Sequence, residues 1–303
     1  MKFLVLGAGG QVGFELLRAL GPRGDVVGAT RSGLLPDEAP CLRIDLAQED
    51  ALTAAFDDAW PDVIVNAAAY TAVDRAEDEA DLADRINHRA VGEIGTWAAR
   101  NGATVVHYST DYVFDGTAKK PYREDDPTAP LGVYGRTKLA GEHALRASGA
   151  QHLILRTAWV YAARGNNFLR TMLRVGAERD EVRVVDDQIG APTPARTIAD
   201  ATASALEQWL GADAAERAGT YHLTSAGRAS WFDFATGIFE HAAARGLIAR
   251  VPRVQPIATA EYPTRARRPA YSVLDCSRFE NAFGIQLPDW RVGLESVLDE
   301  LAT

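Results

Sequence analysis

The chain opens with Met1-Lys-Phe-Leu-Val-Leu-Gly-Ala-Gly-Gly-Gln-Val-Gly-Phe-Glu15, the stretch that decides the fold. Its apolar run from Phe3 to Leu6 predicts a buried strand. Three glycines follow at G-x-x-G-x-x-G spacing, namely Gly7, Gly10 and Gly13. Apolar residues then recur at helical spacing, namely Val12, Leu16, Leu17 and Leu20. Strand, glycine turn and helix in this order are typical of a dinucleotide site, in which the pyrophosphate lies over the first N–H groups of the helix.

The next predicted strand, Asp25 to Thr30, leads directly into Arg31. An enzyme that selects NAD usually has an acidic residue here, which holds the ribose 2′-hydroxyl. Thr30 cannot play that part, whereas Arg31 can pair with a 2′-phosphate. The sequence therefore favours NADPH, with NADH also accepted. The alternative is that Arg31 is a solvated surface charge.

Strand and helix patterns alternate through the first half of the chain, which predicts an α/β fold with a doubly wound, Rossmann-like parallel sheet. We expect residues 1–157 to form the dinucleotide-binding domain. A smaller C-terminal substrate lobe is expected from residues 158–181 and 211–303. Residues of about 182–210, with a strand from Val182 to Val185 and a helix after Ile198, are expected to rejoin the main sheet.

Composition narrows the class of protein. The chain has 303 residues, 47% of them hydrophobic, and a formal net charge of -9 without a long basic block, so nucleic acid is not an expected partner. Cys41 and Cys276 form no metal or disulfide pattern. No signal peptide is recognisable, and no apolar run approaches the roughly 20 residues that span a bilayer. We therefore expect a cytoplasmic protein without a membrane partner.

A candidate catalytic group lies in the second half of this domain. Tyr134 and Lys138 are one helical turn apart, which places a phenol and an ammonium on the same face. The ordinary pKa of a phenol is about 10, and a nearby ammonium is expected to lower it. Thr110 lies at the end of the preceding predicted strand, where its hydroxyl can bond a substrate ketone while Tyr134 supplies the proton. For Thr110 the alternative is ordinary turn chemistry at a strand end.

These motifs resemble the extended short-chain dehydrogenase/reductase family and, within it, the dTDP-4-dehydrorhamnose reductases. The resemblance rests on segments that span nearly the whole chain, among them His107-Tyr-Ser-Thr-Asp-Tyr-Val-Phe and Asp187-Gln-Ile-Gly-Ala-Pro-Thr. It implies an NAD(P)H-dependent oxidoreductase that reduces the 4-keto group of dTDP-4-dehydro-β-L-rhamnose to give dTDP-L-rhamnose, a nucleotide-sugar precursor of cell-surface polysaccharide.

The resemblance also implies roles for particular residues. Catalysis is assigned to Thr110, Tyr134 and Lys138. The implied cofactor contacts are Gly7, Gly10, Gln11, Val12, Gly13, Thr30, Arg31, Asp45, Leu46, Ala67, Ala68, Ala69, Tyr70, Thr71, Tyr108, Tyr134 and Lys138. The implied substrate contacts are Thr110, Asp111, Trp159, Val73 and Asp74.

Some members of this family dimerise through a magnesium ion held by three glutamates. Glu15 and Glu300 stand at matching positions, but Arg196 stands at the third. A cation there would repel a divalent metal. We therefore predict no metal site, and a monomer or weak homodimer.

Several alternatives remain open from the sequence. A nucleotide-sugar epimerase with tightly held NAD would show no net consumption of NADPH, and a cofactor-binding regulatory subunit would need no turnover. Asp186 and Asp187 either order the substrate pocket or end a strand. A basic cluster either neutralises the substrate diphosphate or is solvated, and its members are Arg265, Arg267 and Arg268.

Overall fold

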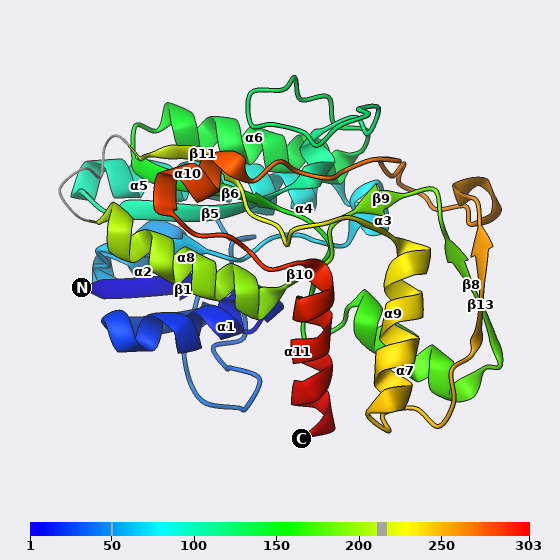
Figure 1. Ribbon diagram of the computed structural model, residues 1–303. Coiled ribbons are helices and arrows are strands. Elements are labelled where there is room, and N and C mark those ends of the chain that lie inside the picture. Colours follow the sequence, from blue (N-terminus) through cyan, green and yellow to red (C-terminus); the bar gives the residue numbers. More distant parts are fainter. Residues whose placement is uncertain (50, 211–216) are drawn as a thin grey trace.

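The centre of the structure is a parallel sheet of seven strands, seen in a computed structural model that describes residues 1–49, 51–210 and 217–303 (Figure 1). Its strand order is β11-β6-β5-β4-β1-β2-β3. The strands are β1 (Lys2–Leu6), β2 (Asp25–Thr30), β3 (Leu42–Arg43), β4 (Val63–Asn66), β5 (Thr104–Thr110), β6 (Gln151–Thr157) and β11 (Gly219–His222). The doubly wound parallel sheet predicted from the alternating pattern is therefore confirmed.

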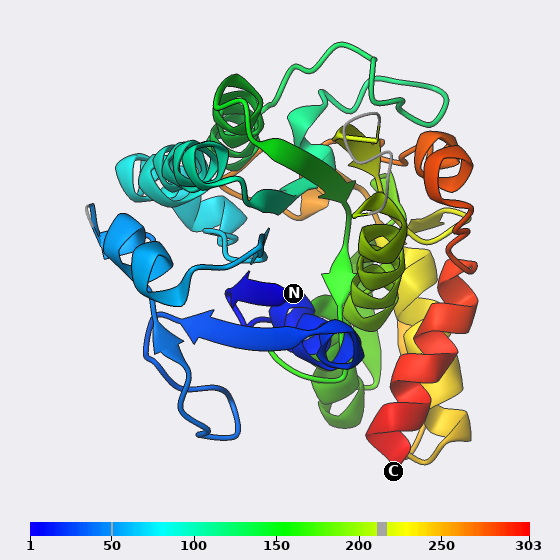
Figure 2. The same cartoon turned by 90° about the vertical axis from the view of Figure 1, so that its left-hand side faces the viewer.

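Helices cover both faces of this sheet (Figure 2). Helices α1 (Gln11–Leu20) and α8 (Ala195–Trp209) pack on one face, where Leu16 and Ile198 bury against Val5. The other face carries α2 (Ala51–Ala59), α5 (Ala90–Asn101) and α6 (Val133–Ala147). The segment before α5 contains α3 (Val73–Ala76), α4 (Ala80–Asp84) and a π-helical turn, Arg85–Arg89.

A smaller lobe follows the main sheet in sequence. Its helices are α7 (Phe168–Glu178), α9 (Trp231–Ala244) and α11 (Trp290–Ala302), and α10 (Ser277–Phe283) packs back on β11. Its strand pairs are β8 (Glu181–Val185) with β13 (Arg253–Ile257), β7 (Val160–Tyr161) with β10 (Thr193–Pro194), and β9 (Ile189–Gly190) with β12 (Ala229–Ser230). Phe234, Leu294 and Tyr161 belong to the separate apolar core of the lobe.

The return of the chain to the main sheet differs from the prediction. Helix α8 does return and packs against α1, but β8 pairs with β13 inside the lobe, so its expected place in the main sheet is wrong. The strand that returns is β11, next to β6. Residue 211, the expected start of the second lobe segment, lies outside the described residues. The domain boundaries themselves stay a prediction.

The carboxyl ends of the main strands point toward the smaller lobe (Figure 1). Ligands of such sheets bind beyond these ends, at the point where the strand order reverses. Among the described residues, no helix combines the length and apolarity needed to cross a bilayer.

Candidate active site

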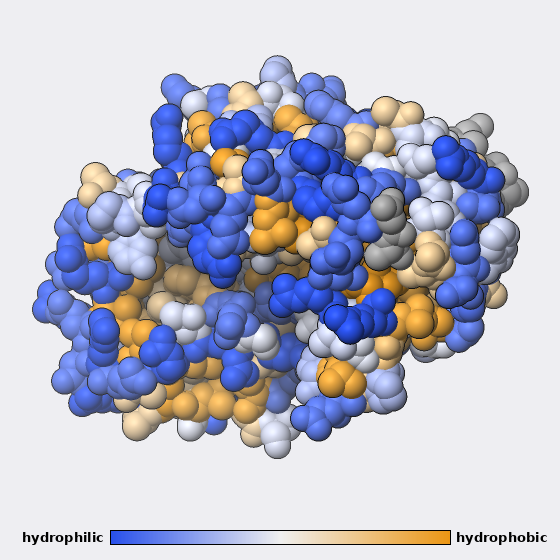
Figure 3. All heavy atoms as spheres, turned by 180° about the vertical axis from the view of Figure 1, so that it is seen from behind, coloured by the Kyte–Doolittle hydropathy of each residue, from blue (hydrophilic) through white to orange (hydrophobic). Residues whose placement is uncertain are grey.

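A cleft of about 950 Å³ opens beyond the carboxyl ends of the main strands. On the rear face of the molecule the surface is hollowed, with apolar groups framed by hydrophilic side chains (Figure 3). Most of the cofactor contacts implied by the sequence line this one cleft. They are Gly7, Gly10, Gln11, Val12, Thr30, Arg31, Asp45, Leu46, Ala67, Ala68, Ala69, Thr71, Tyr108, Tyr134 and Lys138. The structure thus brings them together, and their binding roles stay predictions.

The glycine turn forms one end of the cleft. Gly7 has a left-handed φ of +76°, and a side chain there would lie within 2.7 Å of the Ala68 backbone. The Gly10 N–H donates to the Gly7 carbonyl at 2.9 Å, and α1 begins at the next residue. In the described structure no side chain caps this helix, so its first N–H groups are available to an anion. The turn therefore fits a dinucleotide pyrophosphate.

Two residues of the predicted cofactor set lie outside the lining of the cleft. A Cβ on Gly13 would lie 2.1 Å from the Gly7 carbonyl oxygen, so this glycine lets the helix pack on the turn. Tyr70 is buried, and its hydroxyl donates to Glu79 at 2.7 Å while its N–H donates to Asn87 at 2.8 Å. Both residues shape the walls of the site from behind.

The far end of the cleft carries Thr30 and Arg31 at the end of β2. Thr30 Oγ1 accepts the Gly33 N–H at 3.0 Å and donates to the Leu34 carbonyl at 3.0 Å. Thr30 therefore holds the loop after β2 in shape, while Arg31 is exposed at the cleft, where it can meet a charged group.

The three predicted catalytic residues come from two neighbouring elements. Thr110 is the last residue of β5, and Tyr134 and Lys138 lie in the first two turns of α6. The Thr110 hydroxyl lies near enough to the Tyr134 phenol to lower its pKa. The Tyr134 ring also packs edge-on against Tyr112, with ring centres 5.5 Å apart. The sheet edge therefore presents a phenol and a hydroxyl side by side.

The expected lowering of the phenol's pKa by Lys138 is wrong for this structure. Burial, opposed by the Thr110 hydroxyl and reinforced by nearby Asp111, raises the pKa of Tyr134 to about 12. Lys138 does not offset this because its Nζ is turned to the Tyr108 carbonyl, 2.6 Å away, and to His107 Nε2, 3.3 Å away. Burial lowers the pKa of Lys138 itself to about 8.

None of the five predicted substrate contacts is among the residues that line this cleft. Thr110 and Asp111 are buried beside Tyr134, and Thr110 Oγ1 donates to Asp111 Oδ1 at 3.0 Å. Trp159 stacks on Trp231 of α9, with ring centres 3.5 Å apart and planes inclined by 2°. Trp159 has a left-handed φ of +48°, an uncommon conformation for a bulky residue.

Val73 and Asp74 begin α3, and Asp74 is tied to the basic segment of the lobe. Asp74 Oδ2 pairs with Arg268 at 3.0 Å and Oδ1 accepts the Ala266 N–H at 3.0 Å. Arg268 lies close enough to Tyr112 to affect the pKa of that phenol. Arg268 therefore lies near Tyr112, whose ring packs against Tyr134, whereas Arg265 pairs with Asp78.

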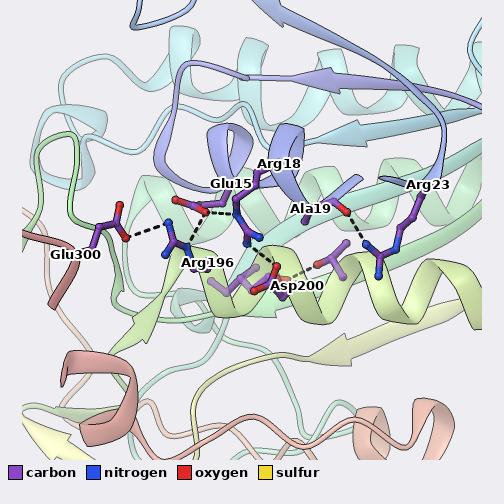
Figure 4. A network of polar contacts seen from close by, with 9 residues as sticks. Glu15, Arg18, Ala19, Arg23, Arg196, Asp200 and Glu300 are labelled. Carbon is purple, nitrogen blue, oxygen red and sulfur yellow. Dashed lines mark hydrogen bonds and ion pairs between the residues drawn. The ribbon is translucent and has the colours of Figure 1, made fainter. Parts of the chain in front are cut away.

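The cluster matched to a magnesium site contains an internal cation instead (Figure 4). Arg196 of α8 pairs with Glu15 of α1 at 3.1 Å and with Glu300 of α11 at 3.1 Å. Arg18 reaches the same Glu15 carboxylate at 3.1 Å. A guanidinium thus neutralises both glutamates, and the absence of a metal there stays a prediction.

The sequence reasoning missed Arg164 in the loop after β7. Arg164 lines the cleft near the glycine turn, and its guanidinium lies 3.3 Å from the centre of the Phe14 ring. Among the described residues its buried Nη1 has no hydrogen-bond partner. In the sequence, a lone arginine in a Gly/Asn-rich loop gives little indication of a binding residue. That Arg164 faces α1 becomes visible only in the fold.

Comparison with known proteins identifies the family. The family model described as "RmlD substrate binding domain" matches residues 1–303. A dTDP-4-dehydrorhamnose reductase of Burkholderia thailandensis is 51% identical over 300 residues, which is 97% of each chain. Solved structures of dTDP-4-dehydrorhamnose reductases include that from Clostridium acetobutylicum, with a TM-score of 0.89, 36% identity and full coverage of both chains. That from Bacillus anthracis, in complex with NADP, has a TM-score of 0.86, 33% identity and 99% coverage of both chains. The chain belongs to the RmlD substrate binding domain family, among the relatives of the dTDP-4-dehydrorhamnose reductases, and the resemblance predicted from its motifs is confirmed.

Proposed function

We propose that this protein reduces the 4-keto group of dTDP-4-dehydro-β-L-rhamnose to dTDP-L-rhamnose with NADPH. One observation carries the proposal: a phenol lies beside a threonine hydroxyl at the sheet edge, and the phenol lines the same cleft as an uncapped glycine turn. The curated relatives with this name match the chain from end to end.

Tyr134 is the proposed proton donor to the sugar oxygen. When bound, NADPH supplies the hydride that adds to C4. The oxygen left on C4 is an alkoxide, which is about as basic as hydroxide and more basic than a phenolate. A phenol with a pKa of about 12 is the stronger acid, so proton transfer from Tyr134 to this oxygen is favourable. A phenol of lowered pKa is therefore unnecessary in the direction of reduction.

Thr110 and Lys138 complete the proposed machinery. Thr110 can hydrogen-bond the phenolate that Tyr134 becomes, or the substrate oxygen as it gains charge. Lys138 lines the cleft beside Tyr134 and can hold a cofactor hydroxyl there. Asp111, Trp159, Val73 and Asp74 remain proposed substrate contacts; Arg268 is added because it is paired to Asp74.

The choice of NADPH rests on cations along the cleft. Arg31 at the end of β2 can pair with a 2′-phosphate, and Arg164 near the glycine turn can neutralise the pyrophosphate. NADH lacks the 2′-phosphate but keeps the pyrophosphate, so we expect it to be accepted less well. We also propose a cytoplasmic location and a monomer or weak homodimer, because Arg196 already neutralises Glu15 and Glu300 within one chain.

The test is a spectrophotometric assay that follows the absorbance of the reduced nicotinamide with the keto-sugar and each cofactor. We expect consumption of NADPH and, more slowly, of NADH, with formation of the 4-hydroxy sugar. Isomerised sugar without consumption of NADPH would instead show an epimerase. A Tyr134→Phe protein that keeps full biological activity would support the regulatory role and overturn the proposal.

A further inference from the structure

A buried chain of polar groups lies behind Lys138, outside the proposed chemistry. His107 of β5 is fully buried, and Asn66 stands opposite it on β4. Asn66 Nδ2 lies 3.1 Å from His107 Nδ1, and His107 Nε2 lies 3.3 Å from Lys138 Nζ. Lys138 Nζ also lies 2.6 Å from the Tyr108 carbonyl oxygen. Asn66, His107 and Lys138 are each at most 2% exposed, so their donors and acceptors must match one another.

The backbone fixes the direction of the first hydrogen bond. The Ala68 N–H, which can only donate, lies 3.2 Å from Asn66 Oδ1. This contact orients the Asn66 amide, so that its Nδ2, also only a donor, faces His107. His107 Nδ1 must therefore accept. A neutral imidazole has one acceptor nitrogen, so the hydrogen of His107 is on Nε2.

The hydrogen on His107 Nε2 points at Lys138. An ammonium has three N–H donors and no lone pair, so it cannot accept this hydrogen bond. A neutral amine can accept it and still donate to the Tyr108 carbonyl. Every partner is satisfied with a neutral Lys138, whereas a charged Lys138 places two donors face to face in a buried site.

We infer that His107 is a positioning residue that disfavours the charged form of Lys138 and favours the neutral amine in the protein without cofactor. The inference deepens the proposed function and rests on it for its catalytic meaning. Protonation of Lys138 then requires the Asn66–His107 bond to break or to reverse. The chain Ala68–Asn66–His107 therefore decides at which pH Lys138 becomes charged.

The surroundings agree with this assignment. Burial lowers the pKa of His107 well below its usual range, so the imidazole does not take up a proton instead. Burial lowers the pKa of Lys138, and the Glu142 carboxylate opposes this only in part. The other charged or titratable groups near this region are Arg146 and Arg156, both paired with Glu142, then His152 on β6, Tyr134 at the cleft, and Asp111 buried beside Tyr134.

The tautomer of His107 can be measured directly in the free protein. Two-bond ¹H–¹⁵N correlation spectra distinguish the two neutral tautomers of each of the six histidines, and a His107→Gln protein identifies the signal. We expect the Nε2–H form at a pH above the pKa of Lys138. An Asn66→Asp protein should show the Nδ1–H form, because a carboxylate accepts where the amide donated. An Nδ1–H form in the parent protein would overturn the inference.

The pKa of Lys138 gives the second readout. The lysines of the chain are Lys2, Lys119, Lys120 and Lys138, so ¹³Cε-labelled lysine gives few signals to titrate. His107→Gln can turn its amide oxygen to Nζ, and we expect the midpoint of Lys138 to rise by about one to two pH units. In His107→Asn the shorter amide does not reach Nζ, so the donor–donor contact is removed but no acceptor is added. The titration midpoint of Lys138 should therefore rise less than in His107→Gln. An unchanged midpoint in both variants would overturn the inference.

Neither measurement uses the sugar substrate or turnover. A negative result in these tests would thus not affect the proposal that the protein is a reductase. A negative result in the reductase assay would likewise not affect the inferred tautomer of His107. If both hold, the limb of the pH–kcat profile that reports Lys138 should move to higher pH in His107→Gln by the same shift as its NMR midpoint.

Discussion

Replacing Asp111 by asparagine should raise the free energy of unfolding of the protein while lowering kcat/KM for the keto-sugar. Asp111 is 2% exposed and follows the last residue of β5. Burial raises its pKa from 3.8 to about 6, although hydrogen bonds from Thr110 and Ser272 work in the opposite direction. The ionised carboxylate is therefore less favourable in the folded protein than in the unfolded chain.

The size of the effect follows from the two pKa values. Their difference is 6 − 3.8, or 2.2 pH units, which corresponds to about 3 kcal/mol at about 1.36 kcal/mol per unit. Below pH 3.8 the carboxyl is protonated in both states and there is no penalty. Between pH 3.8 and 6 the unfolded chain releases its proton while the folded protein keeps it, so stability falls as pH rises. Above pH 6 the whole penalty is present.

Asparagine at position 111 keeps an oxygen for the Thr110 hydroxyl but has no charge to bury. We expect Asp111→Asn to raise the free energy of unfolding at pH 7 by up to about 3 kcal/mol, and this gain to disappear as pH approaches 4. Urea unfolding of the parent and the variant across this range measures both. The kcat/KM for the keto-sugar should fall, because Asp111 is a proposed substrate contact.

Asp115→Asn is the matched control. The Asp115 carboxylate accepts hydrogen bonds from the Thr117 N–H at 3.0 Å and the Tyr122 hydroxyl at 2.7 Å, and these lower its pKa. Its ionised form stabilises the fold above its unfolded pKa, so this variant should lose stability at pH 7. An Asp111→Asn protein that is no more stable than its parent at pH 7, or whose gain persists unchanged to pH 4, would refute the reasoning.

Four further variants test the site. Tyr134→Phe should lower kcat by about 100- to 10,000-fold and leave the Kd for NADPH, measured by fluorescence, nearly unchanged. Arg31→Ala should lower the ratio of kcat/KM with NADPH to that with NADH roughly tenfold, and an unchanged ratio would assign Arg31 to the solvated surface. Arg196→Glu should produce three adjacent carboxylates, so that its thermal midpoint rises on addition of Mg²⁺ while that of the parent does not. The free energy of unfolding of the parent should rise between pH 8 and 10.5, and Lys138→Met should remove this rise. The interval of 2.5 pH units corresponds to about 3 kcal/mol. A parent curve that is flat over this interval would contradict the lowered pKa of Lys138.

The order of elements in the first half of the chain could be predicted because each buried strand is a continuous apolar run. Strand β4, Val63–Asn66, is buried throughout, as expected between two layers of helices. Strand β8 carries a different signal: Val182 and Val184 are buried, whereas Arg183 between them is exposed. Such alternation is typical of a strand with one face to solvent. The sequence thus contained the reason why β8 stays in the lobe.

The strand that does rejoin the main sheet could not be predicted in the same way. Strand β11 is only four residues long and begins with Gly219, whose φ is +149°. Its place beside β6 depends on long-range packing, in which Tyr221 contacts Phe279 and Phe283 of α10. Residue spacing carries no information about such partners, and the same holds for the stack of Trp159 on Trp231.

Burial also explains why the catalytic chemistry could be predicted only in part. The spacing of Tyr134 and Lys138 correctly places both on one helix face toward the cleft, but it says nothing about solvent. In the folded protein, desolvation dominates both pKa values and raises that of the phenol while lowering that of the amine. Each shift favours the uncharged form, so the free site holds a neutral phenol beside an amine that is readily neutral.

The hydroxyl of Thr110 carries a single hydrogen, and two groups lie within reach of it. Asp111 Oδ1 accepts it at 3.0 Å, and the Tyr134 phenol lies near the same hydroxyl. When Asp111 is ionised it takes this hydrogen, and the phenol can only donate to Thr110 or to a substrate oxygen. Once Tyr134 has given up its proton, Thr110 can donate its single hydrogen either to the Tyr134 phenolate or to the Asp111 carboxylate. Burial raises the pKa of Asp111 to about 6 and so favours its protonated form. A protonated Asp111 needs no hydrogen from Thr110, so Thr110 can then donate to the phenolate. The proton-donating power of Tyr134 is therefore linked to the titration of Asp111 through one hydrogen atom, which is why a stabilising Asp111→Asn substitution should still disturb catalysis.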